Sequence, residues 1–301
     1  MVYIIDGKEI ANKICTYLQD RVTVMYAKYR EVPCLAVVII GDDDASLIYV
    51  ANKKKRAESL GMRSMVYKFP SNVLEDEVLQ TINRLNNDNN IHGILLQLPL
   101  PVYINKNNLI DLIHPNKDVD GLGVHNSGLL FSNRVNEALI PCTPHGCMIL
   151  IELVTKKLSG KKVVVIGKSN IVGNPLAQLL LQTQCTVTVA HSMTYNLQSE
   201  CRDADIVISA TGCPGLIKSS YVKKGAIVID VGISRRNVAG KSVITGDVDF
   251  ADVSQVASAI TPVPGGVGPM TIACLMFNTI VATTRKLRIG NNFVEIDAAL
   301  N

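Results

Sequence analysis

Tyr49 and Lys53 are the first residues in the chain whose types and spacing could do chemistry. Side chains four residues apart on a helix share one face, so the phenol and the amine would point the same way. Lys53 also opens a run of four cations, residues 53–56, and such a run usually forms a solvated helix face. If Lys53 alone faces a site, partial burial and the neighbouring cations lower its pKa, and it can then give and take a proton near pH 7.

Gln97 and Asp120 are the next polar candidates, each at a point where the chain turns. Gln97 ends an apolar stretch that is followed by Pro99 and Pro101, and its amide must meet either a ligand or a backbone group, because a bare buried amide is costly. Asp120 lies in KDVDG, residues 117–121. It is either a turn carboxylate or the acceptor of two hydrogen bonds from an amino-substituted ring.

A glycine loop follows an apolar run in KVVVIGKSNIVGNP, residues 162–175. The run predicts a buried parallel strand, since a strand covered on both faces shows no polar alternation. Gly167 permits a sharp turn, and Gly173 lacks the Cβ that would keep a following helix away from the strand or from a phosphate. Ser169 stands where G-x-G-x-x-G has its second glycine, so the segment is either a dinucleotide loop or an ordinary strand-to-helix connection.

The residues after the next strand favour NADP over NAD. An NAD site places an acid on the ribose about twenty residues past the loop. Here the strand TVTVA runs into His191, Ser192 and Met193, so a carboxylate is missing. Ser192 with His191, together with Lys168 in the loop, would bind a 2′-phosphate, unless Ser192 only caps a turn. Ile233, which leaves a later strand, could support the nicotinamide end, or mark an ordinary strand exit.

Strand and helix patterns alternate along the chain, which predicts α/β architecture with mostly parallel sheets. We expect two three-layer α/β domains about a cleft: a first domain over residues 1–146, completed by a C-terminal helix at about 269–290, and a Rossmann-like domain over 147–268. The expected strands are 35–40, 65–69, 91–98, 163–167, 186–190, 206–210 and 226–231. The expected helices run from about Ile10 to Val22, from a cap at Asp44 or Ser46 to Leu60, over 75–85 and 147–157, and from Pro269 to about Lys286.

Composition excludes several classes of protein. The chain has 301 residues, of which 48% are hydrophobic, and a net charge of +4 without a basic tail. We therefore expect a globular protein with no nucleic acid or membrane partner, and the charge is compatible with an anionic small molecule as ligand. Eight scattered cysteines and five histidines lack metal-site spacing, so reduced thiols and no metal are expected. With no signal peptide, and with the apolar stretch 270–282 too short to span a bilayer, a cytoplasmic location follows.

The chain resembles the bifunctional methylenetetrahydrofolate dehydrogenase/cyclohydrolase family along nearly its whole length. The matching segments are ASLIYVANKKKRA (45–57), HGILLQLPLP (92–101), KDVDG (117–121), PCTPHGC (141–147), GKSNIVGNP (167–175), VIDVGI (228–233), GDVDF (246–250) and TPVPGGVGPMT (261–271). The resemblance implies a homodimer formed by the nucleotide domains and a place in one-carbon metabolism and purine biosynthesis. It implies NADP-dependent oxidation of 5,10-methylenetetrahydrofolate to the methenyl form, followed by hydrolysis to 10-formyltetrahydrofolate.

The resemblance also assigns roles to particular residues. Lys53 resembles the proton-transfer residue of the hydrolysis, with Tyr49 and Gln97 orienting the folate, and Asp120 resembles the anchor of the pterin ring. Further folate contacts are expected at Pro99, Pro264 and Gly265. The expected cofactor contacts are Gly167, Lys168, Ser169, Ser192 and Ile233.

One departure bears on the cofactor. Many relatives have arginine where this chain has Lys168, and lysine meets a phosphate as a point charge without a bidentate fork. An NAD-using or dehydrogenase-only enzyme is the alternative within the family. A nucleotide-binding regulatory protein without catalysis is the alternative outside it. The presence of Tyr49, Lys53, Gln97 and Asp120 together argues against the loss of either activity.

Overall fold

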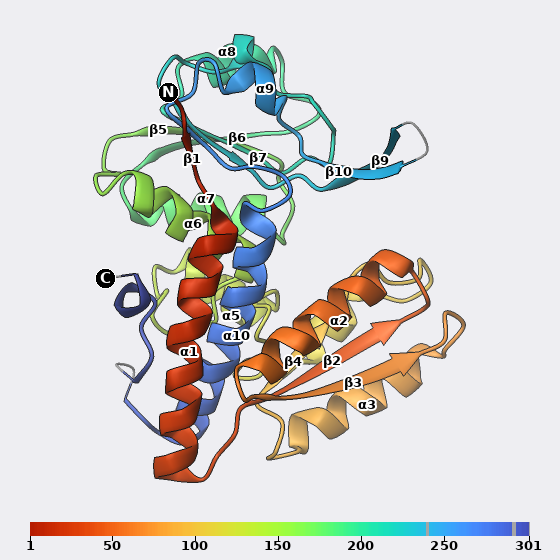
Figure 1. Cartoon of the computed structure of the whole chain (residues 1–301). Coiled ribbons are helices and arrows are strands. Elements are labelled where there is room, and N and C mark those ends of the chain that lie inside the picture. The colour runs from red at the N-terminus through yellow and green to blue at the C-terminus, as the bar shows by residue number, and fades with distance from the viewer. Residues whose placement is uncertain (239–240, 291–292, 301) are drawn as a thin grey trace. The chain divides into compact units, whose positions relative to one another are not determined.

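The computed structural model describes residues 1–238, 241–290 and 293–300 (Figure 1). The chain divides into two compact units, each assembled from two stretches of sequence. Unit 1 comprises residues 1–11 and 143–271, and unit 2 comprises residues 12–142 and 272–301.

The first eleven residues belong to unit 1, which differs from the predicted domain over residues 1–146. Strand β1 (Tyr3–Ile4) pairs in parallel with β11 (Ala259–Ile260), and the Ile5 N–H donates to the Ile260 carbonyl at 2.9 Å. A two-residue strand is too short to show a periodic pattern, so this pairing could not be predicted from the sequence.

Unit 2 is built on a three-stranded parallel sheet in the order β3-β2-β4. The central strand β2 is buried along its whole length, because it has a neighbour on each side and helices above and below. Figure 1 shows α2 on one face of this sheet and α3 on the other. The elements of unit 2 between the two long helices are β2 (Cys34–Ile40), α2 (Asp44–Ser59), β3 (Arg63–Phe69), α3 (Glu75–Asn87), β4 (Gly93–Leu96), α4 (Lys106–Leu112) and α5 (Val124–Phe131).

Two long helices, α1 (Gly7–Tyr29) and α10 (Val267–Lys286), begin in unit 1 and continue into unit 2. The predicted stripe on α1 is confirmed, since its four residues are all buried: Ile10, Ile14, Leu18 and Val22. The expectation that the apolar C-terminal segment is too short to span a bilayer is wrong in length, because α10 is 20 residues long. Yet 67% of the most apolar 18-residue stretch of this helix is buried inside the protein, as in a core helix.

Unit 1 contains a six-stranded sheet in the order β1-β11-β8-β7-β5-β6, in which all neighbouring strands are parallel. Figure 1 shows α6 and α7 on one side of this sheet and α8 and α9 on the other, which gives three layers. Its remaining elements are α6 (Cys142–Val154), β5 (Lys162–Ile166), α7 (Gly173–Gln182), β6 (Thr186–Ala190), α8 (Leu197–Arg202), β7 (Ile206–Ser209), the 3₁₀ turn Ser219–Tyr221, β8 (Ile227–Asp230), and α9 (Phe250–Val253). A separate antiparallel hairpin joins β9 (Ser234–Val238) to β10 (Lys241–Thr245).

Three local predictions need correction. The cap of α2 is Asp43, whose carboxylate accepts from the Ser46 N–H and hydroxyl at 2.8 Å each, so Ser46 is a donor to the cap. Helix α10 begins two residues before Pro269. The strand expected over 91–98 is shorter, since β4 covers only Gly93–Leu96, although the Gln97 N–H still donates to the Val38 carbonyl of β2 at 2.8 Å.

Candidate active site

Helix α2 and strand β4 bring Lys53 and Gln97 into direct contact. The Lys53 ammonium donates to Gln97 Oε1 at 3.0 Å, and Gln97 Nε2 donates to the Leu98 carbonyl at 2.6 Å. Of the three lysines in the cation run, only Lys53 is half-buried, while Lys54 and Lys55 are exposed. The run therefore combines both predicted readings: a solvated face, and one lysine turned into the protein.

Burial and charge oppose each other around Lys53. Burial lowers the pKa of the Lys53 ammonium, while the charge of Asp120 raises it. Burial likewise raises the pKa of Asp120, and the Lys53 charge lowers it. Because burial disfavours the charged form of both groups, their protonation states depend on each other and on what fills the site.

Cys142 belongs to this cluster, and the sequence reasoning missed it by treating the cysteines only as metal or disulfide candidates. Its thiol is buried and donates to the Val119 carbonyl at 3.3 Å. Burial raises the pKa of this thiol well above its ordinary value, so it is a neutral donor. Asn278 on α10 donates to the same Val119 carbonyl at 2.9 Å and to the Ile140 carbonyl at 2.8 Å, which fixes the backbone on either side of Asp120 and Cys142.

The three charged residues of KDVDG have three different roles. Lys117 donates to the carbonyls of Leu85, Asn86 and Asp88 at 2.9, 2.8 and 2.8 Å, and so closes the C-terminal end of α3. Asp118 folds the turn that follows, because its carboxylate accepts from the N–H groups of residues 121, 122 and 123. The turn-forming role that was one reading of Asp120 therefore belongs to Asp118.

The other predicted folate residues are distributed over both units. Tyr49 lies one turn before Lys53 on α2 and is half-buried, and Pro99 is exposed two residues after Gln97. Pro264 and Gly265 belong to unit 1, where the Gly265 carbonyl accepts from the Lys8 N–H at 2.9 Å. Unit 2 by itself thus assembles Lys53, Gln97 and Asp120, and the roles of Tyr49, Pro99, Pro264 and Gly265 stay predictions.

In unit 1 the glycine loop leaves β5 between two neighbouring strands. The Gly167 N–H donates to the Ala190 carbonyl of β6 at 2.8 Å, and the Ala210 N–H beyond β7 donates to the Ile166 carbonyl at 2.8 Å. Gly167 has φ +121°, which a side chain would strain. A Cβ on Gly173 would overlap the Gly167 carbonyl oxygen, so α7 begins against the strand exit only because residue 173 is glycine. This close approach of backbone to a helix N-terminus fits the phosphates of a dinucleotide.

The predicted cofactor residues lie at the same edge of the sheet. Because Ile166 pairs with Ala190, the residues that follow them, Lys168 and Ser192, leave neighbouring strands at one edge, and both are exposed. Thr194 closes the turn after β6, because its Oγ1 accepts from the His191 N–H at 2.8 Å, and the phosphate and turn-cap readings of Ser192 both stay predictions.

Ser169 and Ile233 are the other two side chains at this edge. Ser169 Oγ accepts from the Val172 N–H at 3.1 Å, so it shapes the loop in place of the missing glycine. Ile233 follows β8 and is 45% exposed, which leaves its side chain available to a ligand.

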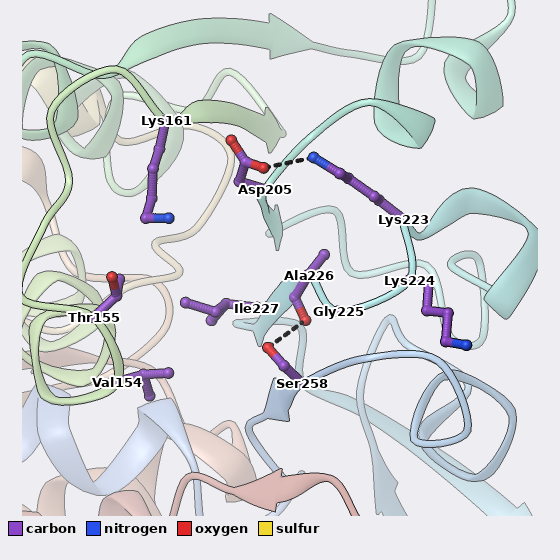
Figure 2. A pocket seen from close by; sticks show the side chains of 10 residues that line it. All are labelled: Val154, Thr155, Lys161, Asp205, Lys223, Lys224, Gly225, Ala226, Ile227 and Ser258. Carbon is purple, nitrogen blue, oxygen red and sulfur yellow. Dashed lines mark hydrogen bonds and ion pairs between the residues drawn. The ribbon is translucent and has the colours of Figure 1, made fainter.

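A pocket of about 260 Å³ lies at the edge of the unit 1 sheet where β5, β7 and β8 begin, opposite the edge that carries the predicted cofactor residues (Figure 2). Lys223 and Asp205 form an ion pair of 2.7 Å at its wall. Ligands of open parallel sheets bind beyond the carboxyl ends of the strands, so this pocket is not the expected nucleotide site. Within the described ranges, no group of three or more His, Cys, Asp or Glu side chains is placed to hold a metal ion.

Family models match both halves of the chain. Residues 5–120 match the catalytic domain of tetrahydrofolate dehydrogenase/cyclohydrolase, and residues 141–287 match the NAD(P)-binding domain of the same family. The chain is 53% identical over 292 residues to the bifunctional protein FolD of Ehrlichia canis, which covers 97% of each chain. It is 50% identical over 286 residues to FolD of Zymomonas mobilis, covering 93% of this chain and 96% of the relative.

Solved structures agree with these matches. The FolD methylenetetrahydrofolate dehydrogenase/cyclohydrolase of Campylobacter jejuni superposes with a TM-score of 0.91 at 44% identity, covering 95% of this chain and 100% of the other. The Trypanosoma brucei enzyme, solved with NADP cofactor and an inhibitor, gives a TM-score of 0.91 at 37% identity over 95% and 99% of the two chains. The chain therefore belongs to the tetrahydrofolate dehydrogenase/cyclohydrolase family.

Proposed function

We propose that this chain oxidises 5,10-methylenetetrahydrofolate to the methenyl form with NADP and then hydrolyses that product to 10-formyltetrahydrofolate. The observation that carries the proposal is the contact of Lys53 with Gln97 beside Asp120 in unit 2. The glycine loop, together with the exposed Lys168 and Ser192 at the same edge of the sheet, supports the use of NADP.

Hydrolysis requires protons to move. Water adds to the carbon between N5 and N10 and loses a proton, and the bond from that carbon to N5 then breaks as N5 gains a proton. Lys53 suits both transfers, because its lowered pKa makes the neutral amine accessible while the Asp120 charge keeps the ammonium accessible. The hydrogen bond to Gln97 Oε1 fixes the direction of the Lys53 amine.

Asp120 is proposed to hold the pterin ring. That ring offers an N–H and an amino group side by side, and one ionised carboxylate accepts both. The charge of Lys53 favours this ionised form against the effect of burial. Tyr49, Pro99, Pro264 and Gly265 are proposed as further folate contacts.

NADP, when bound, takes up the hydride from the methylene carbon, and the N5 lone pair stabilises the resulting cation without a protein base. The role of unit 1 is then to bind NADP and to align it with the folate. Gly167 and Ser169 would hold the phosphates through the loop backbone, Lys168 and Ser192 the 2′-phosphate, and Ile233 the nicotinamide end.

One experiment tests both activities. The full chain is incubated with methylenetetrahydrofolate and either NADP or NAD, and reduced cofactor and the formyl product are followed separately. The proposal expects both signals and a higher kcat/KM with NADP. Equal kcat/KM for the two cofactors would favour the NAD-using alternative, and reduced cofactor without formyl product would favour the dehydrogenase-only alternative.

We also propose a homodimer formed through unit 1 and a cytoplasmic enzyme that supplies formyl groups to purine biosynthesis, as the family resemblance implies. Light scattering of the purified chain tests the first point. A mass of one protomer at micromolar concentration would contradict it.

A further inference from the structure

Asp247 is completely buried at the carboxyl edge of the unit 1 sheet and has no place in the reactions described above. It lies in GDVDF, two residues after β10, and reaches back to the strand exits of β7 and β8. A buried carboxylate needs hydrogen bonds or a cation to offset its desolvation, so its partners indicate what it does.

One oxygen of Asp247 fixes the loop that follows β7. Its Oδ2 accepts from the Ser209 hydroxyl at 3.0 Å, from the Thr211 N–H and hydroxyl at 2.7 and 2.9 Å, and from the Gly212 N–H at 3.3 Å. Four donors to one charged oxygen hold residues 209–212 in a single conformation. Ala210 lies inside this loop and bonds to β5 at Ile166, immediately before the glycine turn. Asp247 therefore stabilises the loop that hydrogen-bonds to β5 next to the turn at Gly167.

The other side of Asp247 meets the loop that follows β8. A Cβ on Gly232 would overlap Asp247 Oδ1, so this carboxylate packs directly on the backbone next to Ile233. In the part of the chain that the structure describes, Oδ1 is buried and lacks a hydrogen-bond partner. The side-chain hydrogen bonds that Asp247 accepts are therefore made through Oδ2.

Asp230 links the two loops to Asp247. Its carboxylate accepts from the Gly232 N–H and the Asp247 N–H at 3.0 Å each, and from the Val248 N–H at 2.9 Å. A Cβ on Gly246 would overlap Asp230 Oδ2, so this second carboxylate is packed just as closely as the first. Two buried acids thus hold three chain segments together at the edge that carries the predicted cofactor residues.

We propose that Asp247 is a positioning residue for NADP, which acts by holding the loops 209–212 and 230–233 in the conformation that receives the cofactor. This inference rests on the proposed cofactor site in unit 1. It predicts a selective defect: NADP binding weakens, while hydrolysis of added methenyltetrahydrofolate, which uses Lys53, Gln97 and Asp120 of unit 2, continues without cofactor.

The test compares Asp247→Ala and Asp247→Asn in the full chain. The alanine removes every bond to loop 209–212, and we expect the Kd for NADP, measured by titration, to rise about tenfold or more. In the asparagine variant the amide oxygen can still face the four donors, so a smaller rise is expected, and this partial rescue marks a positioning role. The matched control is Asp252→Asn, since Asp252 also accepts from a backbone N–H and a hydroxyl, both of Ser219, at 2.7 and 2.8 Å.

The outcomes separate the inference from the proposed function. If the wild type fails to bind NADP, the proposed function is wrong; if the wild type binds and Asp247→Ala binds equally well, the inference is wrong. Equal losses of NADP binding and of hydrolysis would show a general structural role and would also overturn it. If Asp247→Ala does not fold, Thr211→Val removes a single hydroxyl donor from the same oxygen, and an unchanged Kd in that variant would contradict the inference.

Discussion

The polar groups of the two units are used in opposite ways. In unit 2, Lys53 and Asp120 are titratable side chains that face each other's charge, and Lys53 donates a hydrogen bond to Gln97. In unit 1, the carboxylates of Asp230 and Asp247 accept hydrogen bonds from backbone N–H groups and hydroxyls. The edge of the sheet that carries the predicted cofactor residues is made of glycines and loop backbone. A site that moves protons keeps its charged side chains free, whereas a site that aligns a cofactor uses them to fix its shape.

The largest effect should come from Lys53→Met, which removes the proton carrier of unit 2 without adding charge. We expect hydrolysis to fall by about a hundredfold or more, the usual contribution of general acid–base catalysis. NADP reduction should stay measurable, because hydride transfer needs no protein base. Steady-state assays of each activity check this, with Lys54→Met as the control, since Lys54 is exposed and forms only a 3.8 Å ion pair with Glu58. Hydrolysis at the wild-type rate would remove Lys53 from its proposed role.

Gly173→Ala is the variant of unit 1 that corresponds to Lys53→Met in unit 2, and it changes the shape of the backbone instead of removing a reactive side chain. The new Cβ would overlap the Gly167 carbonyl, so the loop must open, and we expect NADP binding to weaken about tenfold with hydrolysis retained. The control is Gly128→Ala in α5, where an added Cβ meets nothing within 4 Å. If Gly173→Ala also abolishes hydrolysis, the two units do not divide the work as proposed.

The same contrast explains what the sequence could and could not predict. Lys53, Gln97 and Asp120 could be predicted as candidates because a reactive side chain on a helix face, after a strand or in a turn is visible as a residue type. Asp118 and Asp247 were not assigned, because a carboxylate that folds a loop looks the same in sequence as one that meets a ligand. Cys142 was missed for a related reason: its thiol matters through burial against Val119 and Asn278, contacts between residues more than twenty positions apart.

Stability should respond to pH with opposite signs in the two units, and unit 2 has the larger expected effect. His92 is buried, and its Nδ1 accepts from the Cys34 N–H at 3.1 Å. Burial, followed by the Lys286 charge, lowers the pKa of His92 to about 3, although Glu31 lies 3.3 Å from Nε2. Glu31 also pairs with Lys286, and protonating Nδ1 would break the Cys34 bond, so the neutral ring is favoured.

Because the folded state then binds fewer protons than the unfolded state, the His92 contribution is present above pH 6.5 and is lost as pH falls. Between pH 7 and pH 5 we expect a loss of about 2 kcal/mol. Urea unfolding at both pH values measures it, and His92→Asn should flatten the dependence whereas a change at the exposed His114 should not. An unchanged slope in His92→Asn would assign the pH dependence to other groups.

Asp230 in unit 1 should give the smaller effect with the reverse sign. Burial raises its pKa from 3.8 to about 6 against the three N–H donors, and the charge of Asp247 adds to the increase. The folded state therefore binds more protons than the unfolded state between these values, so this contribution is present at low pH and is lost as pH rises to 6. From pH 7 to pH 5 unit 1 should gain about 1 kcal/mol while unit 2 loses stability. Hydrogen exchange of the backbone amides in β7 and β8, compared with those in β2 and β4, measures the stability of each unit separately. If the stabilities of both units change with pH in the same direction, the two units do not differ as proposed.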